Sequence, residues 1–278
     1  MEDEKDDDES DRLRDIHHEL STNPIENDKT SSSSSSSSSW LPLESNPEMF
    51  TSFCRRIGNL PQEWSFIDVL SFDNQALQLI PRPVAAVILL FPCTETMYAA
   101  RAAQKKKLLL ATTTSSLTPA AKNAFHVMQV ASFGNACGSI AAVHALANNR
   151  TIANGDGPLA QFTKSTAHLT TAQERGNALV SSLDIHGLSD QSASDHIVAQ
   201  TACPENGDTY LGHHYCCFVN VDGCIVELDG TKVCPVDHGT IPSDSDLLQE
   251  AGRVVRQEWM RIEPNRIDFS LMALAKTG

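Results

Sequence analysis

A cysteine stands where a helix is predicted to begin. In the stretch GNACGSIAAVHALANN, small and polar residues precede Cys137, and apolar residues then recur at Ile140, Val143 and Leu146, the spacing of one helix face. A cysteine is a good nucleophile only as a thiolate, and a helix N-terminus beside an imidazolium stabilises that form. Gly138 leaves room for a carbonyl to approach. Cys137 is therefore a candidate nucleophile, although a single cysteine in this position is more often a packing residue.

A base for this thiol stands on a predicted β-hairpin. In HYCCFVNVDGCIVELDG, two apolar runs flank Asp222-Gly223, which is a strong hairpin signal. Antiparallel pairing across that turn brings Asp229, after the second run, back to His214, at the start of the first. A carboxylate there can hold the imidazole in the tautomer that accepts the thiol proton. Cys137, His214 and Asp229 in that chain order predict a thiol hydrolase; for His214 alone, a structural strand histidine is the alternative.

The remaining histidines and cysteines receive no chemical role. His213 faces the opposite side of the predicted strand from His214, and His144 lies on or beside the apolar face of the helix after Cys137. The eight cysteines are too sparse for a disulfide scaffold and show no CxxC spacing. In HHYCC, His214 and Cys216 face one way and Cys217 the other, so we expect no metal site and no cofactor.

The elements that must position these residues predict an α+β fold. A helix is predicted over 45–58 with Ser45 as its cap, and the unbroken apolar run VAAVILLF is typical of a strand buried on both faces. Residues 186–211 show no usable periodicity, and a connection of that length is usually a lid or binding loop. Further predicted elements are a strand in WSFIDVL, a short helix in DNQALQLIP, a helix from about Pro119, helical structure over 158–182, and a strand or packed tail near the end.

Charge and composition divide the chain at Trp40. Residues 1–39 hold 12 acidic and 4 basic residues and an unbroken serine run, so we expect a disordered acidic, Ser-rich tail, with the catalytic domain over 40–278. The rest of the chain carries 23 acids against 17 bases, which leaves no electrostatic footprint for nucleic acid. The start MEDEKDDDES is unlike a signal peptide, and no apolar run could span a bilayer. We therefore expect a cytoplasmic monomer that binds no membrane, with the nucleus as a further compartment.

The sequence resembles the ubiquitin carboxyl-terminal hydrolases of the papain-like cysteine protease class. Most of the chain from Trp40 carries the resemblance, in WLPLESNPE, WSFIDV, PRPVAAVILLFP, NACGSIAAVHALAN, HYCCFVNVDGCIVELDG and FSLMAL. It implies a central, mostly antiparallel sheet flanked by helices, with Cys137 as nucleophile, His214 as general base and acid, and Asp229 orienting it. It also implies that residues 186–211 form a crossover loop above the active site that restricts the leaving group.

One departure from the family pattern lies before the cysteine. The family places an oxyanion-stabilising glutamine six residues before its nucleophile, where this chain has Ala131; Gln129 stands eight residues before Cys137. Either two extra residues bulge out and Gln129 still reaches the oxyanion, or the donor is missing. Losing one such donor typically costs about 10²–10³ in rate.

The resemblance implies a thiol hydrolase that cleaves small adducts or peptide extensions from the C-terminal glycine of ubiquitin or a ubiquitin-like protein such as Nedd8. The alternative is a ubiquitin-binding protein of the same fold whose activity is weak or lost because the oxyanion glutamine is displaced. The ubiquitin tail is extended and basic, so an acidic protein suits it, and Asp68 in WSFIDV could meet one of its arginines. A solvated strand-end carboxylate explains Asp68 equally well.

Overall fold

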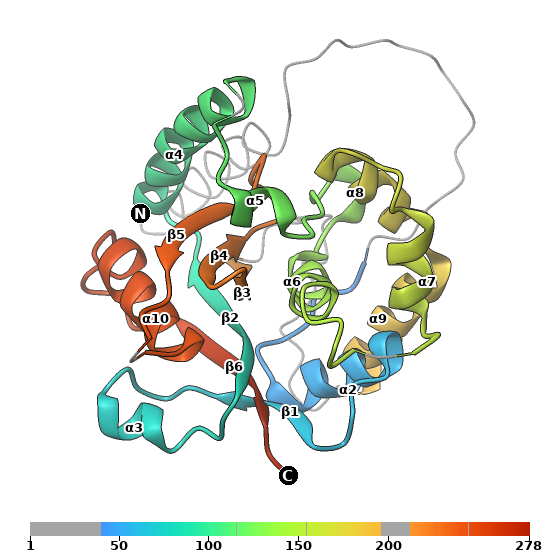
Figure 1. Ribbon diagram of the computed structural model, residues 1–278, viewed down its shortest axis with the longest axis horizontal. Coiled ribbons are helices and arrows are strands. Elements are labelled where there is room, and N and C mark those ends of the chain that lie inside the picture. Colours follow the sequence, from blue (N-terminus) through green and yellow to red (C-terminus); the bar gives the residue numbers. More distant parts are fainter. Residues whose placement is uncertain (1–39, 115, 154, 196–211, 244) are drawn as a thin grey trace, which may run out of the picture.

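A six-stranded antiparallel sheet runs through the centre of the molecule (Figure 1). The computed structural model describes residues 40–278 except 115, 154, 196–211 and 244. Strand order is β1-β6-β2-β3-β4-β5. The strands are β1 (Trp64–Asp68), β2 (Val84–Pro92), β3 (His213–Val221), β4 (Cys224–Leu228), β5 (Val236–Thr240) and β6 (Ser270–Lys276).

β2 lies between β6 and β3, and its residues alternate between two hydrophobic cores. Ala86 and Ile88 pack into the core on one face, whereas Val87 and Leu89 pack into the core on the other. Since helices cover both faces, the strand needs apolar residues at consecutive positions. The predicted strand buried on both faces is confirmed.

The helices form two layers, one on each face of the sheet (Figure 1). The layer that carries the cysteine helix comprises α2 (Pro47–Gly58), α5 (Pro119–Asn123), α6 (Cys137–Ala147), α7 (Pro158–Ser165), α8 (Ala172–Val180) and α9 (Leu183–Asp195). The opposite layer comprises α3 (Asn74–Gln78), α4 (Glu95–Thr113), α10 (Leu247–Val254) and a π-helical turn, η3 (Val255–Trp259). A 3₁₀ turn, η1 (Ala131–Phe133), precedes α6. The α+β class and the predicted central antiparallel sheet flanked by helices are confirmed.

Two of the expectations about helices and loops are wrong. Residues 186–195 belong to α9 rather than to a loop, because this helix packs through small residues: its buried positions are Ile185, Ser189, Ser192 and Ala193. That face is helically spaced but half of it is serine, so hydropathy does not reveal it. The cap of α2 is Asn46 rather than Ser45, since the Asn46 side chain accepts from the backbone of Glu48 and Met49.

Other expectations fall outside the described residues or are refined. The predicted tail over 1–39 and the rest of the predicted crossover loop, 196–211, lie outside the described part of the chain. Helical structure over 158–182 consists of two helices, α7 and α8. Within the described residues, no helix is long and apolar enough to cross a bilayer.

The hairpin between β3 and β4 forms as predicted. Asp222 and Gly223 both have positive φ, 53° and 80°, which is the backbone that a two-residue turn of this kind requires. Pairing runs from Val221 opposite Cys224 to Cys217 opposite Leu228. It fixes the register that returns the chain after β4 to the start of β3.

Candidate active site

Cys137 is the first residue of α6, and its side chain is partly buried. The preceding Ala136 makes no side-chain capping bond, so no side chain satisfies the N–H groups of the first turn. Such groups and the helix dipole favour a negative charge at this end of a helix. The position suits a thiolate, as the sequence predicts.

Gly138 has a different role from the predicted one. It is buried, and a Cβ at this residue would lie 3.0 Å from Cβ of Leu43 and 3.3 Å from the ring of Tyr215. Its small size therefore lets α6 pack closely against β3 and the segment before α2. The interpretation that Gly138 leaves room for a substrate carbonyl is wrong, because its neighbours already fill that space.

His214 and Asp229 meet as the hairpin register predicts. Nε2 of His214 lies 2.8 Å from Oδ1 of Asp229, and both side chains are almost fully buried. The ring is also hydrogen-bonded to Cys137. Since Nε2 is engaged with the carboxylate, Nδ1 is the nitrogen left for the sulfur. The structure thus brings Cys137, His214 and Asp229 together in one chain of contacts.

The charges of this chain of contacts support one another. Burial lowers the pKa of His214, but the charge and hydrogen bond of Asp229, together with Cys137, raise it to about 9. Burial raises the pKa of Asp229, yet the positive charges of Arg101 and His214 hold it well below its usual range. A protonated imidazole beside an ionised carboxylate is the arrangement that stabilises a thiolate.

Gln129 lies beside this site, in the segment that leads to η1. Its backbone N–H donates to the carbonyl of Gly230 at 2.7 Å, next to Asp229. Its side-chain Nε2 donates to the carbonyl of Gly134 at 2.9 Å, across η1. An amide nitrogen has two N–H donors, so one stays available. The turn Ala131–Phe133 sits between Gln129 and Gly134, in the stretch where one of the two alternatives places a two-residue bulge.

The comparisons with known proteins decide the family. The family model described as "Ubiquitin carboxyl-terminal hydrolase, family 1" matches residues 40–261, most of the chain. The chain belongs to this family. A ubiquitin carboxyl-terminal hydrolase of Drosophila melanogaster is 34% identical over 241 residues, which cover 84% of this chain and 96% of that protein. Ubiquitin carboxyl-terminal hydrolase 3 of Arabidopsis thaliana is 34% identical over 249 residues, covering 89% and 98%.

A solved structure shows the same fold. The catalytic domain of Trichinella spiralis UCH37, bound to ubiquitin vinyl methyl ester, superposes with a TM-score of 0.63 at 20% identity, covering 87% of this chain and 99% of that one. As a member of the ubiquitin carboxyl-terminal hydrolase family, the chain is a cysteine-type ubiquitinyl hydrolase, a thiol-dependent deubiquitinase. The predicted family and enzyme class are confirmed.

Sequence reasoning missed two neighbours of Asp229 in this hydrolase. Arg101 of α4 forms an ion pair with it, Nη1 to Oδ2 at 2.8 Å. Thr231 donates to Oδ1 from its backbone N–H at 2.9 Å and from its hydroxyl at 2.8 Å. One signal was present, since Arg101 is a lone cation in the small-residue run YAARAAQ. Thr231 carries no such signal.

His144 and His213, to which the sequence gives no chemical role, take structural positions. His144 is buried in α6, where its Nε2 lies 3.0 Å from the N–H of Val127 and 3.2 Å from its carbonyl oxygen. His213 pairs with Asp268, Nε2 to Oδ2 at 3.1 Å. The described cysteines form no disulfide bond. Among the described residues, no group of three or more His, Cys, Asp or Glu side chains could hold a metal ion.

Proposed function

We propose that this hydrolase cleaves small adducts and peptide extensions from the C-terminal glycine of ubiquitin or a ubiquitin-like protein, with Cys137 as the nucleophile. The observation that carries the proposal is the arrangement around His214. Its ring contacts Cys137, the first residue of α6, and its Nε2 lies 2.8 Å from Oδ1 of Asp229. Family membership supplies the substrate class, and this geometry supplies the residues.

The proposed reaction has two halves. The Cys137 thiolate attacks the glycine carbonyl carbon, and the His214 imidazolium then gives its proton to the leaving amine or thiol as the bond to it breaks. The product is a thioester between Cys137 and ubiquitin. Neutral His214 next takes a proton from a water molecule as the water oxygen attacks the thioester carbon. The bond to sulfur then breaks, ubiquitin leaves with a free carboxyl group, and the Cys137 thiolate again faces the His214 imidazolium. Asp229 keeps the imidazole oriented throughout.

The negative oxygen of each tetrahedral intermediate needs donors. We propose the backbone N–H of Cys137 and the second N–H of the Gln129 side chain, the first being engaged with the carbonyl of Gly134 at 2.9 Å. Gln129 is 7% exposed, and its backbone N–H is bonded to the carbonyl of Gly230, which keeps the residue beside Asp229. Its Oε1 makes no hydrogen bond among the described residues, so the bond from Nε2 to Gly134 is what orients the side-chain amide.

A second candidate function follows from the same contact. If the contact with the Gly134 carbonyl holds the Gln129 amide so that its second N–H does not reach the oxyanion, the oxyanion lacks a donor and the protein acts as a ubiquitin-binding module. Turnover separates the two functions. We expect the wild type to release a fluorescent amine from the ubiquitin C-terminus, Cys137→Ser to release none, and Gln129→Ala to lose about 10²–10³ in kcat.

Each outcome of that assay has a distinct meaning. Turnover lost only in Cys137→Ser would keep the enzyme and assign the oxyanion donor to another group. A wild type that binds ubiquitin without turnover would overturn the hydrolase proposal in favour of the binding module. Asn148→Ala is a useful amide control, since Asn148 caps the far end of α6.

We also propose that the acidic surface of the protein meets the basic ubiquitin tail, with Asp68 at the exposed end of β1 as one contact. Asp68→Lys should raise the KM for the ubiquitin substrate and leave kcat nearly unchanged. Asp156→Lys, the same charge change in the loop before α7, serves as the control. An equal KM in wild type and Asp68→Lys would remove Asp68 from the ubiquitin interface.

We further propose that the enzyme works as a cytoplasmic monomer, without nucleic acid or membrane.

A further inference from the structure

α4 buries an arginine on the face of the sheet opposite α6. The buried residues of this 19-residue helix are Met97, Tyr98 and Arg101. Arginine is almost never fully buried unless a partner takes up its charge. Arg101 is 9% exposed, so its contacts are expected to explain its burial.

The partner of Arg101 is Asp229. Nη1 lies 2.8 Å from Oδ2, with the two side chains 8% and 0% exposed, and the atoms form an ion pair without the alignment of a hydrogen bond. The other oxygen, Oδ1, serves His214 and Thr231. The carboxylate is thus divided, because Arg101 holds one oxygen while His214 uses the other.

Two further contacts fix the direction of the guanidinium. Its Nη2 donates to the hydroxyl of Thr231, which in turn donates to Oδ1 of Asp229 at 2.8 Å. Its carbon lies 4.9 Å from the centre of the Phe91 ring, and that ring meets the His214 ring edge-on at 5.5 Å. Arg101 therefore contacts the carboxylate, a donor to the carboxylate, and the aromatic ring packed against the imidazole.

We propose that Arg101 is a positioning residue of the hydrolase reaction, which keeps the Asp229 carboxylate ionised and turned toward His214. This assignment rests on the proposed function, since it concerns the reaction of Cys137. Arg101 acts on His214 through Asp229 and takes no direct part in the reaction. It sits on a helix from the opposite layer, so the proposal links α4 to the chemistry at α6.

The electrostatics give the expected direction. Burial raises the pKa of Asp229, and among the opposing influences the charge of Arg101 comes ahead of that of His214. Without Arg101 the carboxylate would take a proton at a higher pH, and a neutral Asp229 no longer stabilises the His214 imidazolium. The other titratable groups that interact with Asp229 are Lys232, which lowers its pKa, and Cys93, His126, His144 and Cys216, whose own pKa values it influences.

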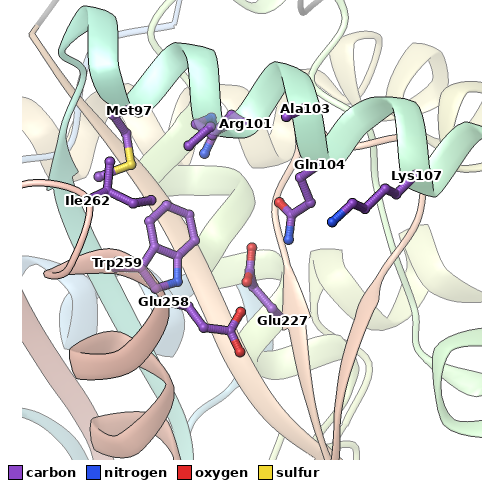
Figure 2. A pocket seen from close by; sticks show the side chains of 10 residues that line it. Met97, Arg101, Ala103, Gln104, Lys107, Glu227, Glu258, Trp259 and Ile262 are labelled. Carbon is purple, nitrogen blue, oxygen red and sulfur yellow. The ribbon is translucent and has the colours of Figure 1, made fainter.

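A cavity gives solvent access to Arg101. Its volume is about 180 Å³, and Arg101 is one of its lining residues. Figure 2 shows Gln104 and Lys107 of α4 on one side and Trp259 and Glu258 on the other. Shortening Arg101 to alanine would enlarge this cavity toward Asp229. A guanidinium ion from solution could then take the place of the lost group.

The experiment measures turnover of ubiquitin carrying a C-terminal fluorescent amine, with folded protein counted by near-ultraviolet circular dichroism. In Arg101→Ala we expect kcat to fall roughly tenfold to a hundredfold, with little change in KM. Added guanidinium should restore part of kcat, whereas urea, of similar shape but neutral, should not. Arg101→Lys keeps a cation and should retain more activity than Arg101→Ala. Lys107→Ala, in the same cavity, is the control and should match the wild type.

The pH profile separates positioning from a merely structural role. The acid limb of kcat/KM in Arg101→Ala should move to higher pH by roughly one unit or more, because Asp229 then protonates sooner. Arg101→Lys should keep it near the wild-type pH, and this variant decides the matter if Arg101→Ala does not fold. An unmoved acid limb in Arg101→Ala, or rescue by urea equal to that by guanidinium, would overturn the proposal. If Arg101→Ala does not fold and Arg101→Lys does, a shift of roughly one pH unit in the acid limb of Arg101→Lys would overturn the proposal. A wild type without turnover would overturn the proposed function as well, so the two failures are distinguishable.

Discussion

At the scale of single residues, the site is a set of buried charges that neutralise one another. Asp229 is 1% exposed and would be unstable as an ion without His214 on one oxygen and Arg101 on the other. The imidazole in turn contacts Cys137. The protonation state of His214 therefore depends on a carboxylate that is itself kept ionised by an arginine.

Replacing Asp229 by asparagine tests this dependence. With the carboxylate present, the pKa of His214 is about 9, so the imidazolium persists until the pH rises through that value. In Asp229→Asn, the effect of burial is no longer offset by a carboxylate, so the pKa of His214 falls and the alkaline limb of kcat/KM should move to lower pH by roughly two units. Asp268→Asn, which removes the partner of the neighbouring His213, is the matched control. An alkaline limb that stays in place in Asp229→Asn would show that the carboxylate does not govern His214.

At the scale of elements, the parts whose residues alternate or repeat in hydrophobicity were predictable. The Asp222-Gly223 hairpin and the buried strand β2 follow from turn chemistry and from an unbroken apolar run. The register of that hairpin returns Asp229 to the neighbourhood of His214. Both signals are local, so a single sequence is enough to show them.

The elements that the sequence did not reveal depend on long-range contacts. The sequence does not reveal α9 because its buried face contains serines. Ser189 is hydrogen-bonded to Ser139 of α6, Oγ to Oγ at 2.6 Å, and such a buried serine is counted as polar in a hydropathy pattern. The partnership of Arg101 and Asp229 joins residues 128 positions apart in the chain. The path of the Gln129 side chain across η1 depends on backbone carbonyls, which have no sequence signature.

Two substitutions in α9 test its helical packing. Gly187 is exposed, with nothing within 4 Å of an added Cβ, so Gly187→Ala should raise the free energy of unfolding by about 0.5–1 kcal/mol if it sits in a helix. Ser189→Leu should lower it by about 1–3 kcal/mol, because the buried site has no room. Chemical denaturation of both variants measures the difference. A destabilising Gly187→Ala together with a neutral Ser189→Leu would contradict a packed helix here.

At the scale of the whole molecule, a second network of buried charges lies behind the site. Glu227 is 1% exposed and pairs with Lys232 and with Nε2 of His238, the latter at 3.0 Å. Nδ1 of His238 lies 3.2 Å from Glu258, next to the π-helical turn's Trp259. The network joins β4, β5 and η3, so it ties the end of the sheet to the opposite helical layer.

This network makes stability depend on pH. Burial lowers the pKa of His238, but Glu227 and Glu258 raise it from 6.5 to about 9. The stabilisation is therefore fully present below pH 6.5 and is lost as the pH rises toward 9, an effect on the order of 3 kcal/mol. His214 contributes a slope of the same sign. In His238→Gln, the free energy of unfolding, measured by chemical denaturation at pH values from 6.5 to 9, should fall less steeply than in the wild type. An equally steep fall would show that groups other than His238 cause the pH dependence.

The most direct test of the central claim, that Cys137 is the nucleophile of a ubiquitin hydrolase, is a covalent trap. Ubiquitin carrying a C-terminal vinyl methyl ester would be incubated with the wild type and with Cys137→Ala, and the modified peptide identified by mass spectrometry. We expect one ubiquitin per molecule, attached to Cys137, and none in the variant. Attachment to another of the eight cysteines, or no attachment to a folded wild type, would contradict the claim.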